Sequence, residues 1–137
     1  MQRYHRVVFG AKGLRKRIGV AVARTLEPGE VVESTVYLHV LGDPSLAILT
    51  ALPVNIRTWI AVLTDRRVIL LKGNETNAAR SEKVAAYPRA SVTVAAGDSA
   101  AKPKRLELQI RGNGSLRFDV PLIWRQDAER FAAGLSG

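Results

Sequence analysis

The chain has 137 residues, 47% of them hydrophobic, which suits one packed domain and argues against global disorder. It contains no cysteine, which excludes disulfides, thiolate metal sites and cysteine nucleophiles. The net charge of +9 gathers at the two ends: residues 1–30 carry seven basic and two acidic residues (+5), residues 31–100 carry seven and six (+1), and residues 101–137 carry seven and four (+3). This excess of positive charge either favours binding to an acidic partner or only aids solubility.

Residues 1–13 are predicted to form a basic arm ahead of a single domain over residues 14–137. The domain begins with a helix over Leu14–Leu26, because apolar residues recur at helical spacing at Leu14, Ile18 and Val22. Gly19 lies in its middle and weakens it by about 1 kcal/mol relative to alanine. Pro28 and Gly29 end it.

Five strand segments are predicted from the middle of the chain. The first, Val32–Val40, alternates apolar and polar residues, with Tyr37 and His39 on the polar side. Arg57–Thr64 and Arg67–Lys72 form a hairpin whose strands are apolar on both faces, which indicates a central, covered pair. Weaker strands follow at Lys83–Tyr87 and Ser91–Ala95. Between the first two strands, Asp43 and Pro44 are typical of a helix start, so Ser45–Leu52 is predicted as a short apolar helical turn.

The last third of the chain predicts a hairpin and a helix. Apolar and polar residues alternate over 106–111 and 115–120, and the Asn-Gly step at Asn113-Gly114 favours a tight turn between them. An amphipathic final helix is predicted from the apolar positions Trp124, Ala128, Phe131 and Leu135. The fold class is therefore mainly β (α+β), an open barrel of about seven antiparallel strands with a C-terminal capping helix and an extra N-terminal helix.

Four segments of the chain carry a resemblance to a known family. They are Leu26-Glu27-Pro28-Gly29-Glu30, the run Ala61–Leu71 with its Thr64-Asp65-Arg66-Arg67 turn, Tyr87–Val92, and Asp127–Phe131. Together they resemble the bacterial pleckstrin-homology (PH)-like domains over Leu14–Leu135. The resemblance implies a non-catalytic binding module, and some such domains assemble with themselves through sheet edges. Eukaryotic relatives often bind phosphoinositides through basic residues near the first hairpin loop, but residues 41–55 contain no lysine or arginine here.

No catalytic residue, metal site, cofactor or small-molecule substrate is expected. The two histidines, His5 and His39, are far apart in the sequence and belong to no cluster with metal-ligand spacing. The glycines lack the strand-to-helix context of a phosphate-binding loop. We therefore expect a protein that is not an enzyme.

A protein partner, including a second copy of the chain, is the favoured interpretation. The partner is expected to dock through a sheet edge and the apolar segment 43–53, whose candidate contacts are Leu46, Ile48, Leu49 and Leu52. Monomeric proteins rarely expose an apolar patch of this kind, so if these residues are exposed they mark an interaction site. If they are buried within the fold, they are not contact residues.

The alternative is a peripheral adaptor on an anionic membrane. Its apolar wedge would be the segment Ser45–Leu52, and its candidate contacts with anionic lipid are the basic residues of the N-terminal segment, Arg3, Arg6, Lys12, Arg15, Lys16 and Arg17. Nucleic acid is disfavoured because Trp59, Trp124, Phe118 and Phe131 follow apolar periodicity and are predicted to lie in the core, where bases cannot stack on them.

Without a signal-peptide pattern or a long apolar run, the expected location is the cytoplasm, with the inner face of the membrane as the alternative.

Overall fold

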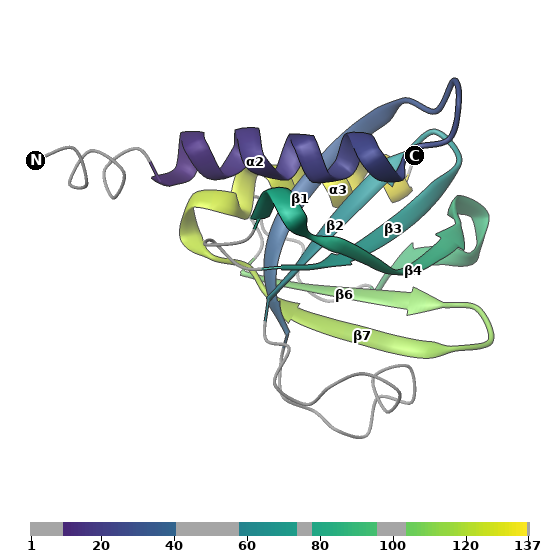
Figure 1. Ribbon diagram of the computed structural model, residues 1–137. Coiled ribbons are helices and arrows are strands. Elements are labelled where there is room, and N and C mark those ends of the chain that lie inside the picture. Colours follow the sequence, from purple (N-terminus) through teal and green to yellow (C-terminus); the bar gives the residue numbers. More distant parts are fainter. Residues whose placement is uncertain (1–9, 41–57, 74–77, 96–103, 137) are drawn as a thin grey trace, which may run out of the picture.

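The computed structural model describes residues 10–40, 58–73, 78–95 and 104–136 (Figure 1). In chain order its elements are α2 (Gly10–Thr25), β1 (Val32–Val40), β2 (Thr58–Thr64), β3 (Arg67–Lys72), the 3₁₀ helix η2 (Ala78–Arg80), β4 (Glu82–Pro88), η3 (Arg89–Ser91), β5 (Val92–Val94), β6 (Arg105–Ile110), β7 (Gly114–Asp119), η4 (Leu122–Trp124) and α3 (Arg125–Ser136). The expected seven strands and C-terminal helix are confirmed.

The strands form one antiparallel sheet in the order β4-β3-β2-β1-β7-β6-β5. β4 and β5 are the two ends of this sheet and do not pair with each other, so the sheet is not closed. β1 joins its two halves: it pairs with β2 from Val32 to His39, but with β7 only at His39 and Val40. The first part of β1 therefore has a strand neighbour on one side only among the described residues.

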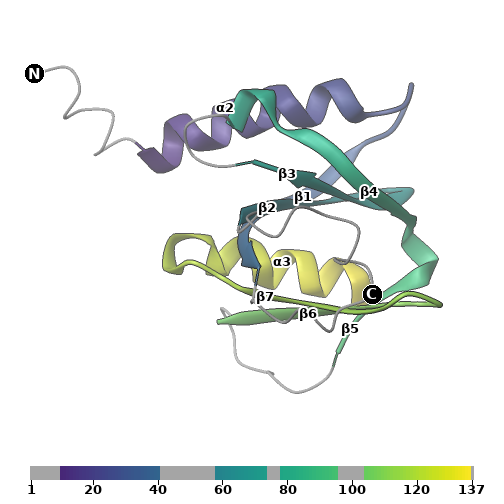
Figure 2. The same ribbon diagram turned by 60° about the horizontal axis from the view of Figure 1, so that its bottom comes forward.

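The two long helices cover opposite faces of the β1–β4 half, with α2 outside and α3 between this half and the β5–β7 half (Figure 2). α3 packs closely on β2, because a Cβ added at Gly134 would lie 2.6 Å from Leu63 Cδ2. α2 buries the apolar residues Leu14, Ile18, Ala21 and Val22. Six consecutive residues of β2, Trp59 to Thr64, are consequently buried, which confirms the predicted central, doubly covered hairpin.

Two details of the prediction were wrong. Tyr37 does not lie on a solvated face: it is buried, and its ring centroid is 6.0 Å from that of Trp124. Alternation within β1 could not reveal this, because the covering residue comes from a distant part of the chain. The first helix begins at Gly10 rather than Leu14, so residues 10–13 belong to the helix and not to the predicted arm. Apolar spacing marks helical turns by their large apolar residues, and the sequence Gly-Ala-Lys-Gly at 10–13 has none.

The core confirms the predicted aromatic positions. Trp59, Trp124, Phe118 and Phe131 are all buried, and the rings of Trp59 and Phe118 meet at a centroid distance of 6.0 Å. The predicted helical turn at Ser45–Leu52 lies outside the described residues. None of the helices that the structure describes combines the length and the apolar character needed to span a bilayer.

Candidate partner-binding groove

A groove of about 410 Å³ lies between α2, the first part of β1 and the start of α3. α2 contributes the apolar side chains of Ile18 and Val22, Leu26 follows directly after the helix, and β1 contributes Val32 to Thr35. Trp124 and Arg130 line it from the region of α3. The groove thus combines apolar side chains with the part of a β-strand that has only one strand neighbour.

The β1 edge is the chemically distinctive part of this groove. Alternate residues of a strand direct their backbone N–H and C=O groups to opposite sides. From Val32 to Leu38 one side of β1 is taken by β2, while β7 joins only from His39 onward. α3 packs against β1, but its own backbone groups are bonded within the helix and cannot continue the ladder. Val32 and Glu33 are exposed and Ser34 and Thr35 are half-buried, so this part of the β1 edge is accessible to an extended chain.

Arg15 connects the two helices at one end of the groove. Its guanidinium donates two hydrogen bonds to Asp127, Nη2 to Oδ2 at 2.7 Å and Nη1 to Oδ1 at 3.1 Å. Its Cζ lies 4.1 Å from the centroid of the Trp124 ring, a cation–π geometry. The hydrogen bond to Asp127 raises the pKa of Arg15 above its usual range. Arg15 therefore organises the groove wall and is not free to serve as a phosphate ligand.

Room in the groove comes from two small residues of α2, Gly19 and Ala23. A Cβ added at Gly19 would meet no atom within 4 Å, although this glycine lies in the middle of a helix. A glycine there costs about 1 kcal/mol relative to alanine, and no close packing in the structure requires it. A larger side chain at this position would enter the groove without displacing the core.

Some charged side chains around the groove form ion pairs and others do not. Arg15 and Asp127 pair with each other, and Glu33 pairs with Arg89 at 2.8 Å. Arg130 is exposed and forms no ion pair with any residue that the structure describes. A ligand lying in the groove would meet one unneutralised positive charge there.

A buried ion pair fastens the segment that leads from α2 into β1. Glu30 accepts from Arg67, Nε to Oε2 at 2.8 Å and Nη2 to Oε1 at 2.9 Å, and from the Thr64 hydroxyl at 2.6 Å. These hydrogen bonds, above all that from Arg67, lower the pKa of Glu30 to about 2. Both carboxylate oxygens are occupied, so Glu30 is a structural anion and offers no base for catalysis.

Two of the four segments that carry the resemblance, Leu26–Glu30 and the Thr64–Arg67 turn, contain this pair and Thr64, whose hydroxyl donates to Glu30. Pro28 and Gly29 form the centre of a turn in which Glu30 N–H donates to the Glu27 carbonyl at 3.0 Å, and Gly29 has a φ of 81°, which favours glycine. In the facing turn, Asp65 Oδ1 accepts from the Val31 N–H at 2.9 Å. The two segments thus hold each other in place.

His39 is exposed, and its ring lies edge-on to that of Tyr37 at a centroid distance of 6.0 Å. No hydrogen bond from His39 to a carboxylate occurs among the described residues. Within the same part of the chain, no three side chains of the metal-ligating types come together. The expectation that the protein is not an enzyme stays a prediction.

The predicted contact residues divide into two groups. Leu46, Ile48, Leu49 and Leu52, like Arg3 and Arg6, lie outside the described residues, and Lys12 is described only as part of the α2 backbone. Arg15, Lys16 and Arg17 belong to α2. These three do not form one free basic face: Arg15 is engaged by Asp127, Arg17 is half-buried and Lys16 is exposed.

The groove itself was not predicted. Arg15 and Asp127 are 112 residues apart, and no local pattern links them. Gly19 gave the only local indication of the groove, because a glycine in the middle of an amphipathic helix usually has a packing or functional reason. Neither the models of known protein families nor the curated proteins give a match to this chain.

Proposed function

We propose that this protein is a non-catalytic interaction module of the PH-like type, which binds an extended segment of a partner protein in the groove between α2 and α3. The strand order and the C-terminal helix are compatible with the fold that the resemblance implies. The observation that carries the proposal is the available edge of β1 beside an apolar groove. Addition of a strand to such an edge is a common mode of peptide recognition.

The walls of the groove specify the chemistry of the segment. Ile18, Val22 and Trp124 favour an apolar side chain, and the groove is wide enough for it next to Gly19. Arg130 favours a carboxylate close by, because it has no described anionic partner and a rim charge mainly selects the partner. An extended segment with one apolar and one acidic residue satisfies both.

A second copy of the chain is a specific case of this partner. The far edge of β4 has no strand neighbour among the described residues, and it carries the half-buried residues Val84, Ala85, Ala86 and Tyr87. Pro88 at its end lacks a backbone donor, which limits pairing there. We therefore place the principal site at the β1 edge, and light scattering of the purified chain tests self-association.

The proposal is tested with a random peptide library displayed on phage and panned on the full chain. Selected peptides are synthesised, and their affinity is measured by fluorescence anisotropy for the wild type and for Gly19→Phe. The phenylalanine should fill the groove and weaken binding at least tenfold, since the position offers open space and not core. Val20→Phe is the matched control, because Val20 is exposed and does not line the groove.

Two results would contradict the proposal. One is a set of peptides that bind Gly19→Phe as tightly as the wild type. The other is a library that yields no peptide enriched in an apolar residue next to an acidic one. Circular dichroism of both variants shows whether the fold is retained.

A further inference from the structure

The turn that enters α3 presents two neighbouring apolar side chains to solvent. Leu122 is 73% exposed and Ile123 is 57% exposed, whereas Val120 before them and Trp124 after them are both 2% exposed. Two exposed aliphatic side chains next to each other form a small apolar patch that a partner surface can cover. Val31 and Val32 are adjacent and exposed too, at 59% and 36%, but have smaller side chains.

The turn is held firmly in this position. The Trp124 N–H donates to the Pro121 carbonyl at 2.8 Å, and Arg125 Nε donates to the Val120 carbonyl at 3.2 Å. Arg15 Nη2 reaches the Ile123 carbonyl at 3.4 Å. With Trp124 buried beneath it, the turn is a fixed projection whose exposed side chains need no rearrangement to meet a partner.

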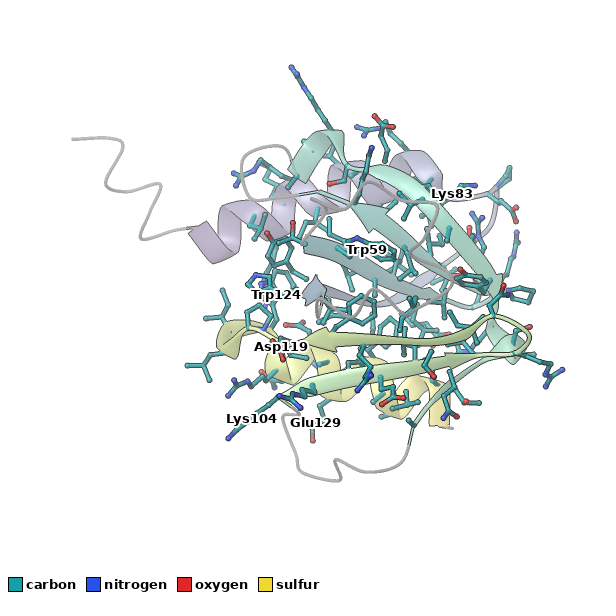
Figure 3. All side chains as sticks on the ribbon, turned by 90° about the horizontal axis from the view of Figure 1, so that it is seen from below. Trp59, Lys83, Lys104, Asp119, Trp124 and Glu129 are labelled. Carbon is teal, nitrogen blue, oxygen red and sulfur yellow. The ribbon has the colours of Figure 1, made fainter. Side chains whose placement is uncertain are left out.

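Basic residues lie beside this exposed turn. The N–H of Val120 donates to the Lys104 carbonyl at 2.8 Å, which places Lys104 beside the turn, and Figure 3 shows Lys104 and Trp124 toward the same end of the molecule. The first half of α2 lies over this end (Figure 1). Three basic residues form hydrogen bonds to this turn or to Val120 before it: Arg15, Lys104 and Arg125.

Of these three cations, only Arg15 forms an ion pair with a described carboxylate. Asp127 is paired with Arg15, and Asp119 lies 3.5 Å from Arg105. Neither Lys104 nor Arg125 forms an ion pair with a described carboxylate. An aliphatic tip beside Lys104 and Arg125, two cations without an ion pair to a described carboxylate, has the chemistry of a membrane interface, in which apolar side chains enter the acyl boundary and cations meet lipid phosphates.

We propose that Leu122 and Ile123 dock this protein on an anionic lipid bilayer, with Lys104 and Arg125 facing the headgroups. This goes beyond the peptide groove, which it does not require. It also differs from the membrane contact predicted from the sequence, because the apolar element is the turn before α3 rather than the segment 43–53. A groove beside a membrane-bound tip would hold a partner protein at the bilayer surface.

The test is co-sedimentation of the full chain with vesicles of phosphatidylcholine containing 30% phosphatidylserine, at physiological salt. Vesicles of phosphatidylcholine alone show the contribution of charge, and excess glycerophosphoserine shows whether the free headgroup competes. We expect binding to the anionic vesicles and no competition by the soluble headgroup. The double change Leu122→Ser/Ile123→Ser should weaken binding about tenfold, with Val20→Ser/Val31→Ser as the control at two exposed valines elsewhere.

The charge contribution is tested with Lys104→Glu against Lys83→Glu. Both changes alter the net charge equally, and Figure 3 places Lys83 far from Lys104. Lys104→Glu should weaken binding on the order of tenfold and Lys83→Glu much less, because each basic residue at the surface contributes about fivefold. Equal losses from the two lysine variants, equal losses from the two apolar pairs, or no binding to anionic vesicles would each overturn the proposal. Gly19→Phe should bind vesicles as the wild type does, which separates this site from the groove.

Discussion

Two arginine–carboxylate pairs, at opposite ends of α2, have different surroundings. Arg67 and Glu30 follow its last turn, with side chains 14% and 0% exposed, and they share further hydrogen bonds with Thr64. Arg15 and Asp127 lie near its first turns, with side chains 43% and 14% exposed, beside the groove and the apolar tip. The two pairs have similar short distances, 2.8 Å and 2.7 Å.

Distance alone therefore does not show what an ion pair contributes. A pair removed from water leaves an uncompensated charge when it is broken, whereas an exposed pair is screened and loses little. We infer that the Glu30 end is the rigid fastening of the fold. The Arg15 end positions a binding surface and leaves it accessible.

Glu30→Gln should produce the largest effect, a loss of about 3–5 kcal/mol in the free energy of unfolding. The change keeps the shape of the side chain but leaves Arg67 without its anion. Urea denaturation at pH 7 measures it. Glu33→Gln is the control, because Glu33 is exposed and its pair with Arg89 is at the surface. If both variants lose the same free energy, the contrast between buried and exposed pairs is wrong.

Acid should weaken the same end of the molecule. The pKa of Glu30 is lowered to about 2 from an ordinary value of 4.5. Its contribution to stability is therefore fully present above pH ~4.5 and disappears as the pH falls through about 2, a loss on the order of 2–3 kcal/mol. Urea denaturation between pH 6 and pH 2 should show a smaller decrease for Glu30→Gln than for the wild type. Parallel curves for the two proteins would contradict this assignment.

The glycines of the two long helices should respond in opposite directions. Gly19→Ala should stabilise the fold by up to about 1 kcal/mol, since the added methyl enters open space and the helix gains propensity. Gly134→Ala should destabilise it by about 1–3 kcal/mol, because the methyl would lie 2.6 Å from Leu63. Thermal denaturation measures both. A destabilising Gly19→Ala would mean that the groove is filled by the protein itself.

Asp127→Asn should have the smallest effect, a loss of about 0.5 kcal/mol, because the pair is partly exposed. The stacking of Arg15 on Trp124 should remain. The difference in melting temperature from the wild type should shrink as salt is raised to 1 M, since screening removes what the pair contributes. If Asp127→Asn loses as much free energy of unfolding as Glu30→Gln, the two ion pairs do not differ in the way that their burial predicts.

The sequence was most informative where structure is local. Alternation located both strands of the hairpin 106–120, and helical spacing located the buried residues of α3. Continuous apolar runs in β2 and β3 indicated two covered faces without showing what covers them. Leu122 and Ile123 were overlooked because they precede the helix that the spacing of Trp124, Ala128 and Phe131 defines.

Periodicity, turn residues and apolar runs act over a few neighbouring positions, so the seven strands and the C-terminal helix could be predicted from the sequence. The pair of Arg15 with Asp127 across 112 residues, the burial of Tyr37 against Trp124 and the groove between α2 and α3 became visible only in the folded chain. Such contacts depend on how separate elements pack, and each partner alone resembles any other surface residue. The basic residues at the two ends of the sequence meet at the exposed turn before α3, where Arg15 comes from the first segment and Lys104 and Arg125 come from the last.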